Sequence, residues 1–318
     1  MIVRFIGEHV GERHEQGLRW GVESICTQLT ELGCKIAPAT YYEHRFRKRT
    51  LREVWDEELQ PQVIKVHAEN YGVYGARKVW LQLNRERGEA AQPIARCTVE
   101  RLMGELGLRG AIRGKVKRTT IADPSAKRPG DLVGRKFGPL APDRLWVADF
   151  TYVSTWAGWV YVAFVIDAYA RRIIGWRSST SMTAQLVLDA IEHAVWTRGR
   201  EGRGVIGVIQ HHDHRSQYTS VAYSERLAAD GIRPSMGVVG SSYDNALAET
   251  INGLYKTELI KSRGPWRTID QVEVVTAEWV DWFNRRRLYE YCGDLPPAQM
   301  ETAHYAQQPT TTLVKVSN

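Results

Sequence analysis

The segment from residue 145 to residue 179 constrains the fold most strongly, because it contains three runs rich in Val, Ile, Tyr and Trp. These runs, LWVADFTYV, WVYVAFVID and RRIIGWRSS, are joined by short connections, which is typical of antiparallel strands linked by hairpins. A helix over 183–197, a strand at VIGVIQ, a helix over 219–230, a short piece near IRPSM and a helix from Ser242 onward are expected next. This order predicts an α/β fold with a mixed sheet and helices on its faces.

Three acidic residues stand out in this region. Asp149, Asp213 and Glu249 have 63 and then 35 residues between them. Asp149 interrupts an apolar strand, Asp213 follows the run VIGVIQHH, and Glu249 lies inside a helical pattern. A carboxylate in or beside an apolar sheet is costly unless a cation or hydrogen-bond donors compensate it. Three carboxylates brought together would form an all-oxygen site suited to Mg²⁺.

The helix around Glu249 has its polar residues in register. Four of them share one stripe because their spacings are four, three and four residues: Asn245, Glu249, Asn252 and Lys256. Three apolar residues lie on the opposite face and are expected to pack on the sheet: Leu247, Ile251 and Leu254. A solvated surface lysine is the usual fate of a residue such as Lys256. Its register with Glu249 favours a role at the same site, and the DNA contacts expected from this stripe are Asn245, Asn252 and Lys256.

The length and composition are those of a soluble globular protein. The 318 residues, 43% of them hydrophobic and 25% charged, correspond to two or three domains. Four cysteines without paired spacing favour buried free thiols in a reducing compartment. The longest apolar stretch, WAGWVYVAFVI, falls short of the roughly 20 residues of a membrane helix. Arg4 and Glu8 break the N-terminal apolar run, which excludes a signal peptide. We expect a cytoplasmic protein with no membrane partner.

The excess positive charge lies in one segment. Residues 109–140 contain nine basic and two acidic residues, which accounts for the whole net charge of +7. Because this stretch is weakly apolar and punctuated by Gly and Pro, it predicts an extended linker that contacts phosphates. A basic run alone would indicate a solvated linker, but beside a candidate phosphodiester site nucleic acid is favoured. The expected DNA contacts here are Arg113, Lys115, Lys117 and Arg118.

The part before the linker is expected to be helical. Residues 1–50 look like a helical pair ending at the IAPATYY turn, and residues 51–108 look like three short helices. The last two of the three are compatible with a helix-turn-helix unit that turns Arg96, Thr98 and Arg101 toward a DNA groove. The alternative is a helix pair with a structural role, because most pairs of this length do not contact DNA.

After the linker we expect a core over 141–264 and an amphipathic helix with a tail over 265–318. In the C-terminal helix, three aromatic residues lead into three arginines: Trp279, Trp282 and Phe283, then Arg285, Arg286 and Arg287. This helix either closes the core or clamps DNA, and closure of the core is favoured. Three tryptophans of the strands are expected to pack between sheet and helices rather than to stack on flipped bases: Trp146, Trp159 and Trp176.

Some polar residues near the acids have competing interpretations. Asp167 ends a strand before a tight connection, so turn capping is favoured over metal binding. Asp244 stands at a helix start and is expected to cap it. Three histidines suggest an HD-type phosphohydrolase or a zinc site: His211, His212 and His214. Because this cluster follows a strand, the carboxylate site is favoured, with at most one histidine near the metals and the rest on its polar rim.

Together these motifs resemble the DDE transposases of the retroviral-integrase superfamily, and more narrowly the second reading-frame product of insertion-sequence family three. The resemblance is carried by WVADFTYV, by HxD followed by SQYTS, and by SSYDNALAETINGLYKTEL. It extends to GVESIC and IAPATYY, to YGARKVW and RCTVERLM, and to WFNRRR. It implies an RNase H-like, integrase-like core with a mixed five-stranded sheet over 141–264, preceded by a small all-α helix-turn-helix-like domain and, over 1–50, a joining segment.

The resemblance also implies a reaction and its partners. Three carboxylates would bind two Mg²⁺ ions, with Mn²⁺ as a substitute, for cleavage and strand transfer at the ends of an insertion sequence. Asp149 would bridge the metals, Asp213 would ligate one and Glu249 the other, while Lys256 would contact terminal DNA. The implied partners are double-stranded DNA of the terminal inverted repeats and the target, further copies of this chain on that DNA, and the upstream reading-frame product.

The segment that begins at His211 departs from the family pattern H-[ST]-D-x-G-S-Q-Y. Arg215 occupies the place of the glycine. Arginine there would either strain the turn that aims Asp213 or add a phosphate contact. The alternative function is a catalytically weak DNA-binding protein that acts with, or inhibits, the full frameshift-fusion transposase, because Met1 begins in what resembles the joining segment.

Overall fold

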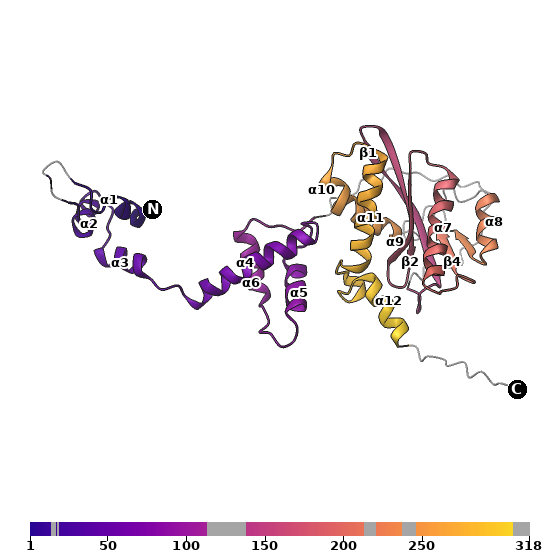
Figure 1. Ribbon diagram of the computed structural model, residues 1–318, viewed down its shortest axis with the longest axis horizontal. Coiled ribbons are helices and arrows are strands. Elements are labelled where there is room, and N and C mark those ends of the chain that lie inside the picture. The colour runs from indigo at the N-terminus through magenta and orange to yellow at the C-terminus, as the bar shows by residue number, and fades with distance from the viewer. Residues whose placement is uncertain (14–16, 18, 113–137, 213–220, 237–245, 308–318) are drawn as a thin grey trace. The chain divides into compact units, whose positions relative to one another are not determined.

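The computed structural model of the chain (Figure 1) describes residues 1–13, 17, 19–112, 138–212, 221–236 and 246–307. It contains two compact units, Met1–Gln62 and Val63–Asn318. In the described part of the chain, no helix combines the length and the apolar character that crossing a membrane requires.

The described part of residues 1–50 contains three helices where a pair was expected. They are α1 (Ile2–His9), α2 (Val22–Glu31) and α3 (Pro38–Phe46). Tyr41 of α3 is buried against Ile6 and Ile25 of the other two helices. The expected turn at IAPATYY is wrong, because α3 begins inside it with proline in its first turn. Proline is well tolerated there, since the first helical N–H has no partner inside the helix.

The three helices expected over 51–108 are confirmed. They are α4 (Leu51–Glu69), α5 (Ala76–Arg87) and α6 (Arg96–Glu105). The side chain of Asn84 in α5 accepts a hydrogen bond from Ile94 N at 2.7 Å, and Trp80 Nε1 donates to Ile94 O at 2.7 Å. These bonds fix the connection that leads into α6.

The second unit contains the predicted mixed sheet. Its strands are β1 (Leu145–Thr155), β2 (Gly158–Asp167), β3 (Arg172–Ser179), β4 (Ile209–His212) and β5 (Arg233–Met236). The strand order is β3-β2-β1-β4-β5. The pairs β1–β2 and β2–β3 are antiparallel, whereas β1–β4 and β4–β5 are parallel. β1 is therefore the central strand, and the prediction of a mixed five-stranded sheet is confirmed.

Strand β4 starts four residues later than the VIGVIQ pattern indicated. Gly207 has φ of +83° and its N–H bonds to Gly231 O at 2.8 Å, so the chain turns before the strand begins. The four residues of β4 include both His211 and His212, and they pair with Leu145–Ala148 of β1. The last residue of β4 therefore lies beside Ala148, near the middle of β1.

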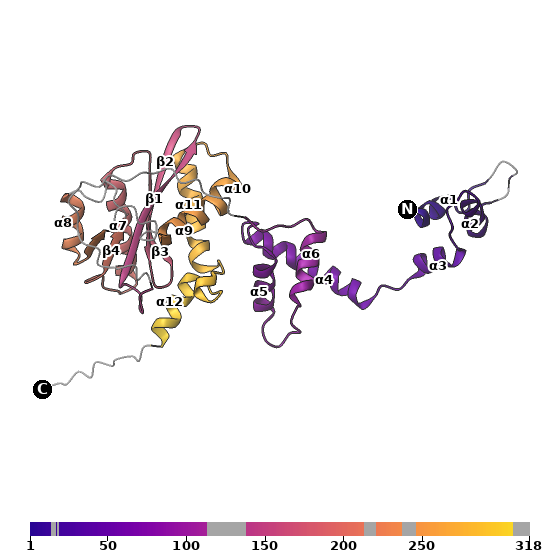
Figure 2. The same ribbon diagram turned by 180° about the vertical axis from the view of Figure 1, so that it is seen from behind.

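Helices cover both faces of the sheet (Figures 1 and 2). The α7 helix (Ala184–Arg200) packs on β3 and β2, while α9 (Ala246–Tyr255) and α11 (Ile269–Arg285) pack on β1 and β3. Figures 1 and 2 show α7 and α11 on opposite sides of the sheet, with α8 (Val221–Ala229) beyond α7. Gly175 of β3 allows close contact with α7, since a Cβ there would lie 2.2 Å from Ala190 O.

Alternation along β1 separates two environments. Trp146, Ala148 and Phe150 belong to the apolar core that α7 covers. The intervening residues face the other side of the sheet, where Phe164, the β2 partner of Asp149, contacts the rings of Tyr255 and Trp279. Asp149 therefore lies on the face covered by α9 and α11.

The C-terminal segment closes this second face. After α9 come a π-helix η2 (Lys256–Ile260), α10 (Lys261–Arg263), α11, a 3-10 helix η3 (Glu290–Cys292) and α12 (Pro297–Ala306). The expectation that the amphipathic helix closes the core is confirmed, because three of its aromatic side chains are fully buried: Trp279, Trp282 and Phe283. Arg287 is also buried and bonds both carboxylate oxygens of Glu258 in η2.

The same segment binds the helical domain within the second unit. Trp282 Nε1 donates to Asn70 Oδ1 at 3.1 Å, and Leu288 N donates to the Tyr74 hydroxyl at 2.7 Å. Arg77 forms a two-bond ion pair with Asp294, with N–O distances of 2.9 and 2.6 Å. The end of α4 and the start of α5 are thus attached to the C-terminal segment that covers the sheet.

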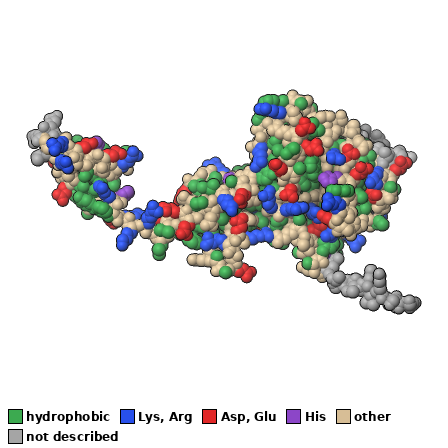
Figure 3. Space-filling model, in the orientation of Figure 1, with side chains coloured by type: hydrophobic (Ala, Val, Ile, Leu, Met, Phe, Trp, Pro, Cys, Tyr) green, Lys and Arg blue, Asp and Glu red, His purple; other side chains and the backbone are tan. Residues whose placement is uncertain are grey.

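Two expectations about side-chain environments need correction. All four cysteines are free thiols, but Cys34 and Cys97 are exposed rather than buried. Trp146 is buried as predicted, whereas Trp159 is 53% exposed, because the end of the β1–β2 hairpin extends past the helices that cover the sheet. Figure 3 shows basic and acidic side chains interspersed over the described surface, in keeping with the balanced charge outside residues 109–140.

Candidate active site on the central strand

Asp149 is the best-placed of the three predicted acids. It lies in the middle of β1, between the partner strands β2 and β4, and is 4% exposed. A carboxylate buried this deeply requires polar compensation. Part of that compensation comes from α9, because Asn252 Nδ2 donates a hydrogen bond of 2.9 Å to Asp149 Oδ2.

The α9 helix brings Glu249 to the same place. It packs on β1 through buried Leu247, Ile251 and Tyr255. Glu249 is exposed and lies one turn before Asn252, and residues three apart on a helix are neighbours at about 5–6 Å between Cβ atoms. The Asn252–Asp149 bond therefore places the backbone of Glu249 beside the carboxylate of Asp149.

The predicted polar stripe was expected to be exposed. Glu249 is exposed as expected, whereas Asn252 is not. Asn252 is 9% exposed and points at β1, so it does not have the exposed position expected of a DNA contact. The physical reason is that Asp149 lies under the helix, and an amide N–H₂ group there satisfies a buried carboxylate better than an apolar side chain does. Among the three predicted apolar residues, Leu247 and Ile251 are buried and Leu254 is half-buried.

Lys256 continues the stripe at the first residue of the π-helix. It is half-buried, and its Nζ lies 4.3 Å from the centroid of the Tyr152 ring. Tyr152 follows Asp149 by three residues on β1. The structure therefore places both Glu249 and Lys256 along the same stretch of β1. The π-helix itself gave no signal in the sequence pattern.

The structure describes the chain up to His212, the residue before Asp213. His212 pairs with Ala148 in the parallel register, so β4 ends next to the residue that precedes Asp149. Asp213 lies outside the described residues, as do His214, Arg215, Asp244 and Asn245.

The histidines of β4 are core residues. His211 and His212 are each 1% exposed, so the expected polar-rim position is wrong for both. His211 Nδ1 lies 3.0 Å from Ser235 Oγ of β5, and the His212 ring meets Tyr223 edge to face. Both are buried because β4 is an internal strand with β1 on one side and β5 on the other.

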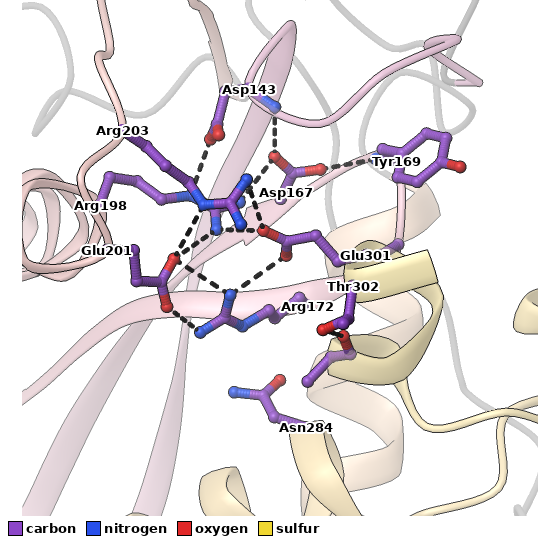
Figure 4. Close-up of polar contacts among 12 residues, drawn as sticks. Asp143, Asp167, Tyr169, Arg172, Arg198, Glu201, Arg203, Asn284, Glu301 and Thr302 are labelled. Carbon is purple, nitrogen blue, oxygen red and sulfur yellow. Dashed lines mark hydrogen bonds and ion pairs between the residues drawn. The ribbon is translucent and has the colours of Figure 1, made fainter. Parts of the chain in front are cut away.

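Asp167, the acid that rivalled Asp149, has a structural setting (Figure 4). Its Oδ1 accepts a hydrogen bond from Tyr169 N at 2.8 Å, and its Oδ2 accepts one from Asp143 N at 2.7 Å. The Arg198 guanidinium also lies 3.1 Å from Oδ2. Burial raises the pKa of Asp167 to about 6, and Arg198 opposes that rise. The turn-capping interpretation of Asp167 is confirmed.

Arg198 is the centre of a buried charge network at this end of the sheet. It contacts four carboxylates at N–O distances of 2.5–3.1 Å: Asp143, Asp167, Glu201 and Glu301. Arg172 bonds Glu201 and Glu301 as well. Figure 4 shows these side chains converging from β2, β3, α7 and α12. The network fixes α12 to the core.

The predicted DNA contacts of the helical parts have varied outcomes. Arg113, Lys115, Lys117 and Arg118 lie outside the described residues. On α6, Arg96 is exposed and Arg101 partly exposed, and they pair with Glu100 at 2.7 Å and Glu105 at 2.9 Å respectively. These one-turn ion pairs on the helix surface are weak, so they leave α6 suitable for phosphate contacts.

Among the residues that the structure describes, no group of three His, Cys, Asp or Glu side chains is arranged to hold a metal ion. Asp149 and Glu249 supply carboxylate oxygens, the ligand type that Mg²⁺ prefers. The third expected oxygen donor, Asp213, belongs to the undescribed segment that follows β4.

Comparison with known proteins identifies the family of this chain. The integrase core domain family matches residues 139–242 and, through a second family of that description, residues 230–297. The HTH-like domain family matches residues 54–116. The chain is 66% identical over 274 residues to the putative transposase for insertion sequence element IS986/IS6110 of Mycobacterium tuberculosis, covering 86% of this chain and 97% of that protein.

The chain belongs to the IS3 family of insertion-sequence transposases. Two further relatives are the transposase for IS629 of Shigella sonnei, 49% identical over 91% of this chain and 94% of its own length, and transposase InsF for IS3A of Escherichia coli K12, 29% identical over 93% and 98%. The predicted resemblance and the predicted transposase function are confirmed.

Solved structures with a likeness to this transposase include the simian T-cell lymphotropic virus intasome in complex with PP2A regulatory subunit B56 gamma. That chain is 14% identical, with a TM-score of 0.44 over 80% of this chain and 78% of its own. The HTLV-2 integrase catalytic core domain in complex with magnesium is 15% identical, with a TM-score of 0.40 over 51% and 98%. The family assignment rests on the sequence relatives and the matching domains.

Membership of this family makes the protein a polynucleotidyl transferase that acts on DNA. The integrase core match covers β1, which carries Asp149, and the second core match covers α9, which carries Glu249. The HTH-like match contains α5 and α6, as the helical pattern predicted. Three features were missed in the sequence: the inward position of Asn252, the π-helix at Lys256 and the exposure of the hairpin aromatics. Of these three, the sequence indicated only that Asn252 lies near Glu249, because it follows Glu249 by one helical turn.

Proposed function

We propose that Asp149, Asp213 and Glu249 are the catalytic carboxylates with which this transposase cuts and joins DNA at the ends of its insertion sequence. The observation that supports this most is the 2.9 Å hydrogen bond from Asn252 to Asp149. This bond attaches α9, the helix that carries Glu249, to the centre of the sheet, which supports a shared site for two acids that are 100 positions apart in the sequence.

The donor set fits divalent cations. Carboxylate oxygens are hard ligands, and phosphate oxygens of a bound DNA strand add further ones, so few additional protein ligands are needed. We infer that Asp149, Asp213 and Glu249 hold two Mg²⁺ ions, for which Mn²⁺ substitutes. The ions would supply activation of the attacking water or 3′-hydroxyl and stabilisation of the leaving oxygen of an in-line displacement.

The side chains around these acids orient them. Asn252 holds one oxygen of Asp149, so that the carboxylate has one orientation when the substrate arrives. Phe164, the β2 partner of Asp149, is buried beside it against the rings of Tyr255 and Trp279 and limits entry of water from that side. Lys256 lies along β1 beyond the acids, where its ammonium group can contact a DNA phosphate next to the reacting one.

The other parts of the chain supply DNA binding. We propose that α6 of the HTH-like domain and the basic residues of 109–140 hold the terminal repeats, and that a DNA-bound homo-oligomer pairs the two ends. The attachment of α4 and α5 to α11 and the residues after it, through Asn70, Tyr74 and Arg77, supports transmission of that binding to the core. The upstream reading-frame product is a further proposed partner.

The test is a cleavage and strand-transfer assay on oligonucleotides that carry the terminal repeats, with Mg²⁺ or Mn²⁺. We expect activity from the wild type and none from Glu249→Gln, while the matched control Glu278→Gln, an exposed acid on α11, retains it. Calorimetric titration with Mg²⁺ adds a readout that does not depend on turnover, and Glu249→Gln should weaken metal binding. A wild type that binds these ends but never cuts or joins them, with Glu249→Gln unchanged in metal binding, would overturn the proposal in favour of a non-catalytic DNA-binding role.

A further inference from the structure

The end of the β1–β2 hairpin exposes three aromatic side chains. Tyr152 is 53% exposed, Trp156 is 69% exposed and Trp159 is 53% exposed. Tyr152 and Trp159 contact each other edge to face, with ring centroids 5.3 Å apart. Large aromatic residues gathered on a surface indicate a binding site more often than a packing defect. The hairpin has no need of them for its own core, which lies nearer the middle of the sheet.

Two cations accompany these rings. The Lys256 ammonium lies 4.3 Å from the centroid of Tyr152, and the Arg267 guanidinium lies 5.2 Å from the centroid of Trp156. Each distance is within the range of a cation–π contact. The surface thus alternates flat apolar rings with positive charges, and we call these five residues the hairpin surface: Tyr152, Trp156, Trp159, Lys256 and Arg267.

The hairpin surface is held in place by backbone hydrogen bonds from a distant segment. Trp156 N donates to Trp266 O at 3.0 Å, and Ala157 N donates to Arg267 O at 3.2 Å. Trp266 is 4% exposed, and its Nε1 donates to Ile260 O at 3.0 Å. Because the hairpin and the segment around Arg267 are bonded to each other and anchored by a buried ring, little conformational entropy is lost when a ligand binds.

We propose that the hairpin surface binds unpaired nucleotides of the DNA end, with bases stacked on the rings and phosphates against Lys256 and Arg267. Aromatic rings interleaved with cations are the usual chemistry of single-stranded nucleic acid sites. This proposal rests on the proposed function, since it needs a DNA end at Asp149. Tyr152 is three residues beyond Asp149 on β1, roughly 10 Å at about 3.3 Å per residue, and Trp156 follows the last residue of that strand. A strand leaving the site would reach the surface within a few nucleotides.

Charge favours DNA over a second protein chain as the occupant. Apolar protein interfaces are depleted of lysine at their centres, whereas Lys256 lies directly over one of the rings here. A surface of this composition matches single-stranded DNA, in which phosphates alternate with flat bases.

The matched control for this site is Trp196 on α7. It is 57% exposed, and the Arg200 guanidinium lies 5.1 Å from its ring centroid. Its chemistry therefore equals that of Trp156. The position of Trp196 differs from that of Trp156, because the same end of α7 carries Arg198, which bonds Asp143 before the start of β1. The hairpin lies at the opposite end of that strand.

The experiment compares two DNA probes in a Glu249→Gln background, so that catalysis plays no part. One is a blunt terminal-repeat duplex, and the other is the same duplex with an unpaired tail of about six thymidines, within the site size of stacking surfaces. We expect Trp156→Ala with Trp159→Ala to weaken binding of the tailed probe about 10-fold or more, to change binding of the blunt duplex less than about twofold, and to abolish the quenching of tryptophan emission by the tail. Trp196→Ala and the conservative Trp156→Phe with Trp159→Phe should retain tail binding.

Three outcomes would overturn the proposal. Equal affinity for both probes in the wild type would show that the surface does not recognise unpaired nucleotides. Equal loss on both probes would make it a duplex contact. Unchanged DNA binding with a lower molar mass by light scattering would make it an interface between copies of the chain. None of these outcomes depends on whether Asp149, Asp213 and Glu249 are catalytic, because that proposal is tested by cleavage and metal binding in the otherwise wild-type chain.

Discussion

Two buried acids near β1 have opposite surroundings. Asp167, opposite Trp146 in the antiparallel register, faces the Arg198 guanidinium and two backbone N–H groups. Asp149, three positions further along β1, accepts a hydrogen bond from the neutral amide of Asn252. An arginine neutralises a carboxylate, whereas an amide orients it without cancelling its charge. The first arrangement holds the fold together, and the second leaves Asp149 with the negative charge that the proposed metal ions require.

The difference shows how burial of charge is used in this protein. Around Arg198, four carboxylates and two arginines are joined by short ion pairs that connect the sheet, α7 and α12. Such a network contributes to stability only while every member keeps its partners. Around Asp149, orientation comes from one helix, and the proposed metal ions supply the remaining positive charge. Substitutions should therefore affect stability at the first site and catalysis at the second.

The largest expected effect comes from exchanging each acid for its amide. Asp149→Asn should lower strand transfer on the order of 10³-fold or more, as for removal of other catalytic acids, and should leave the melting temperature unchanged or higher, because a neutral amide costs less to bury. Asp167→Asn should lower the melting temperature and leave the activity of the folded protein within about twofold. The measurements are strand-transfer rates and thermal melts. The comparison fails if Asp167→Asn is the one that inactivates the folded enzyme.

Removing the central cation should give the next largest effect. Arg198→Met removes the guanidinium shared by Asp143, Asp167 and Glu301, of which Glu301 alone keeps an ion pair with Arg172. The variant should lower the free energy of unfolding by about 3–5 kcal/mol. Arg200→Met, two residues along the same helix and exposed, should change it by less than about 0.5 kcal/mol. Urea unfolding followed by circular dichroism measures both. Equal stability of the two variants would show that the network is not essential.

Asn252→Ala should lower activity by about 10–100-fold and raise the Mg²⁺ concentration needed for half-maximal rate, since partners that orient metal ligands have effects of this size. Its matched control is Asn284, also buried, whose side chain bonds the backbone of Ile173 at 2.9 and 2.8 Å. Asn284→Ala should lower stability without changing the Mg²⁺ requirement. If both variants shift the Mg²⁺ dependence alike, Asn252 is only a packing residue.

The smallest expected effect is a pH dependence from Asp167. Its folded-state pKa of about 6 lies above the usual value near 3.9, so the folded protein binds more protons than the unfolded chain between these two values. Stability therefore falls as pH rises through that window. From pH 5 to pH 7 the loss due to this group is about 1 kcal/mol. Asp167→Asn should remove that component from a plot of unfolding free energy against pH, and an unchanged slope would contradict the assignment.

Local patterns were sufficient to predict most elements of the fold. The three hairpin-linked strands, α4 to α6 and the helix that closes the core depend on periodicity and turn residues close in sequence, and they appear where expected. Two of the predictions that failed depended on distant segments. The buried position of His211 and His212 depends on β5 lying beside β4, and the exposure of Trp159 depends on where the covering helices end.

The candidate site divides in the same way. Asp149 and Glu249 could be singled out because an acid in an apolar strand and an acid on a polar helical stripe are visible in the sequence. The inward turn of Asn252 could not be, because the helical spacing that aligns it with Glu249 does not say which edge of the stripe faces the sheet. Asn252 faces the sheet because Asp149, which is buried beneath the helix, requires a hydrogen-bond donor there.

The sequence by itself determined the strand and helix pattern, the family and the identity of the acids, because these are properties of residue type and spacing. Tertiary structure decided which acids are neutralised by arginine and which remain available for cations. It also placed Arg267 beside Trp156, more than 100 residues apart, through backbone bonds that no local pattern encodes. The physical reason is that charge compensation and ring contacts depend on distances in space, and those are set only when the sheet and its covering helices pack together.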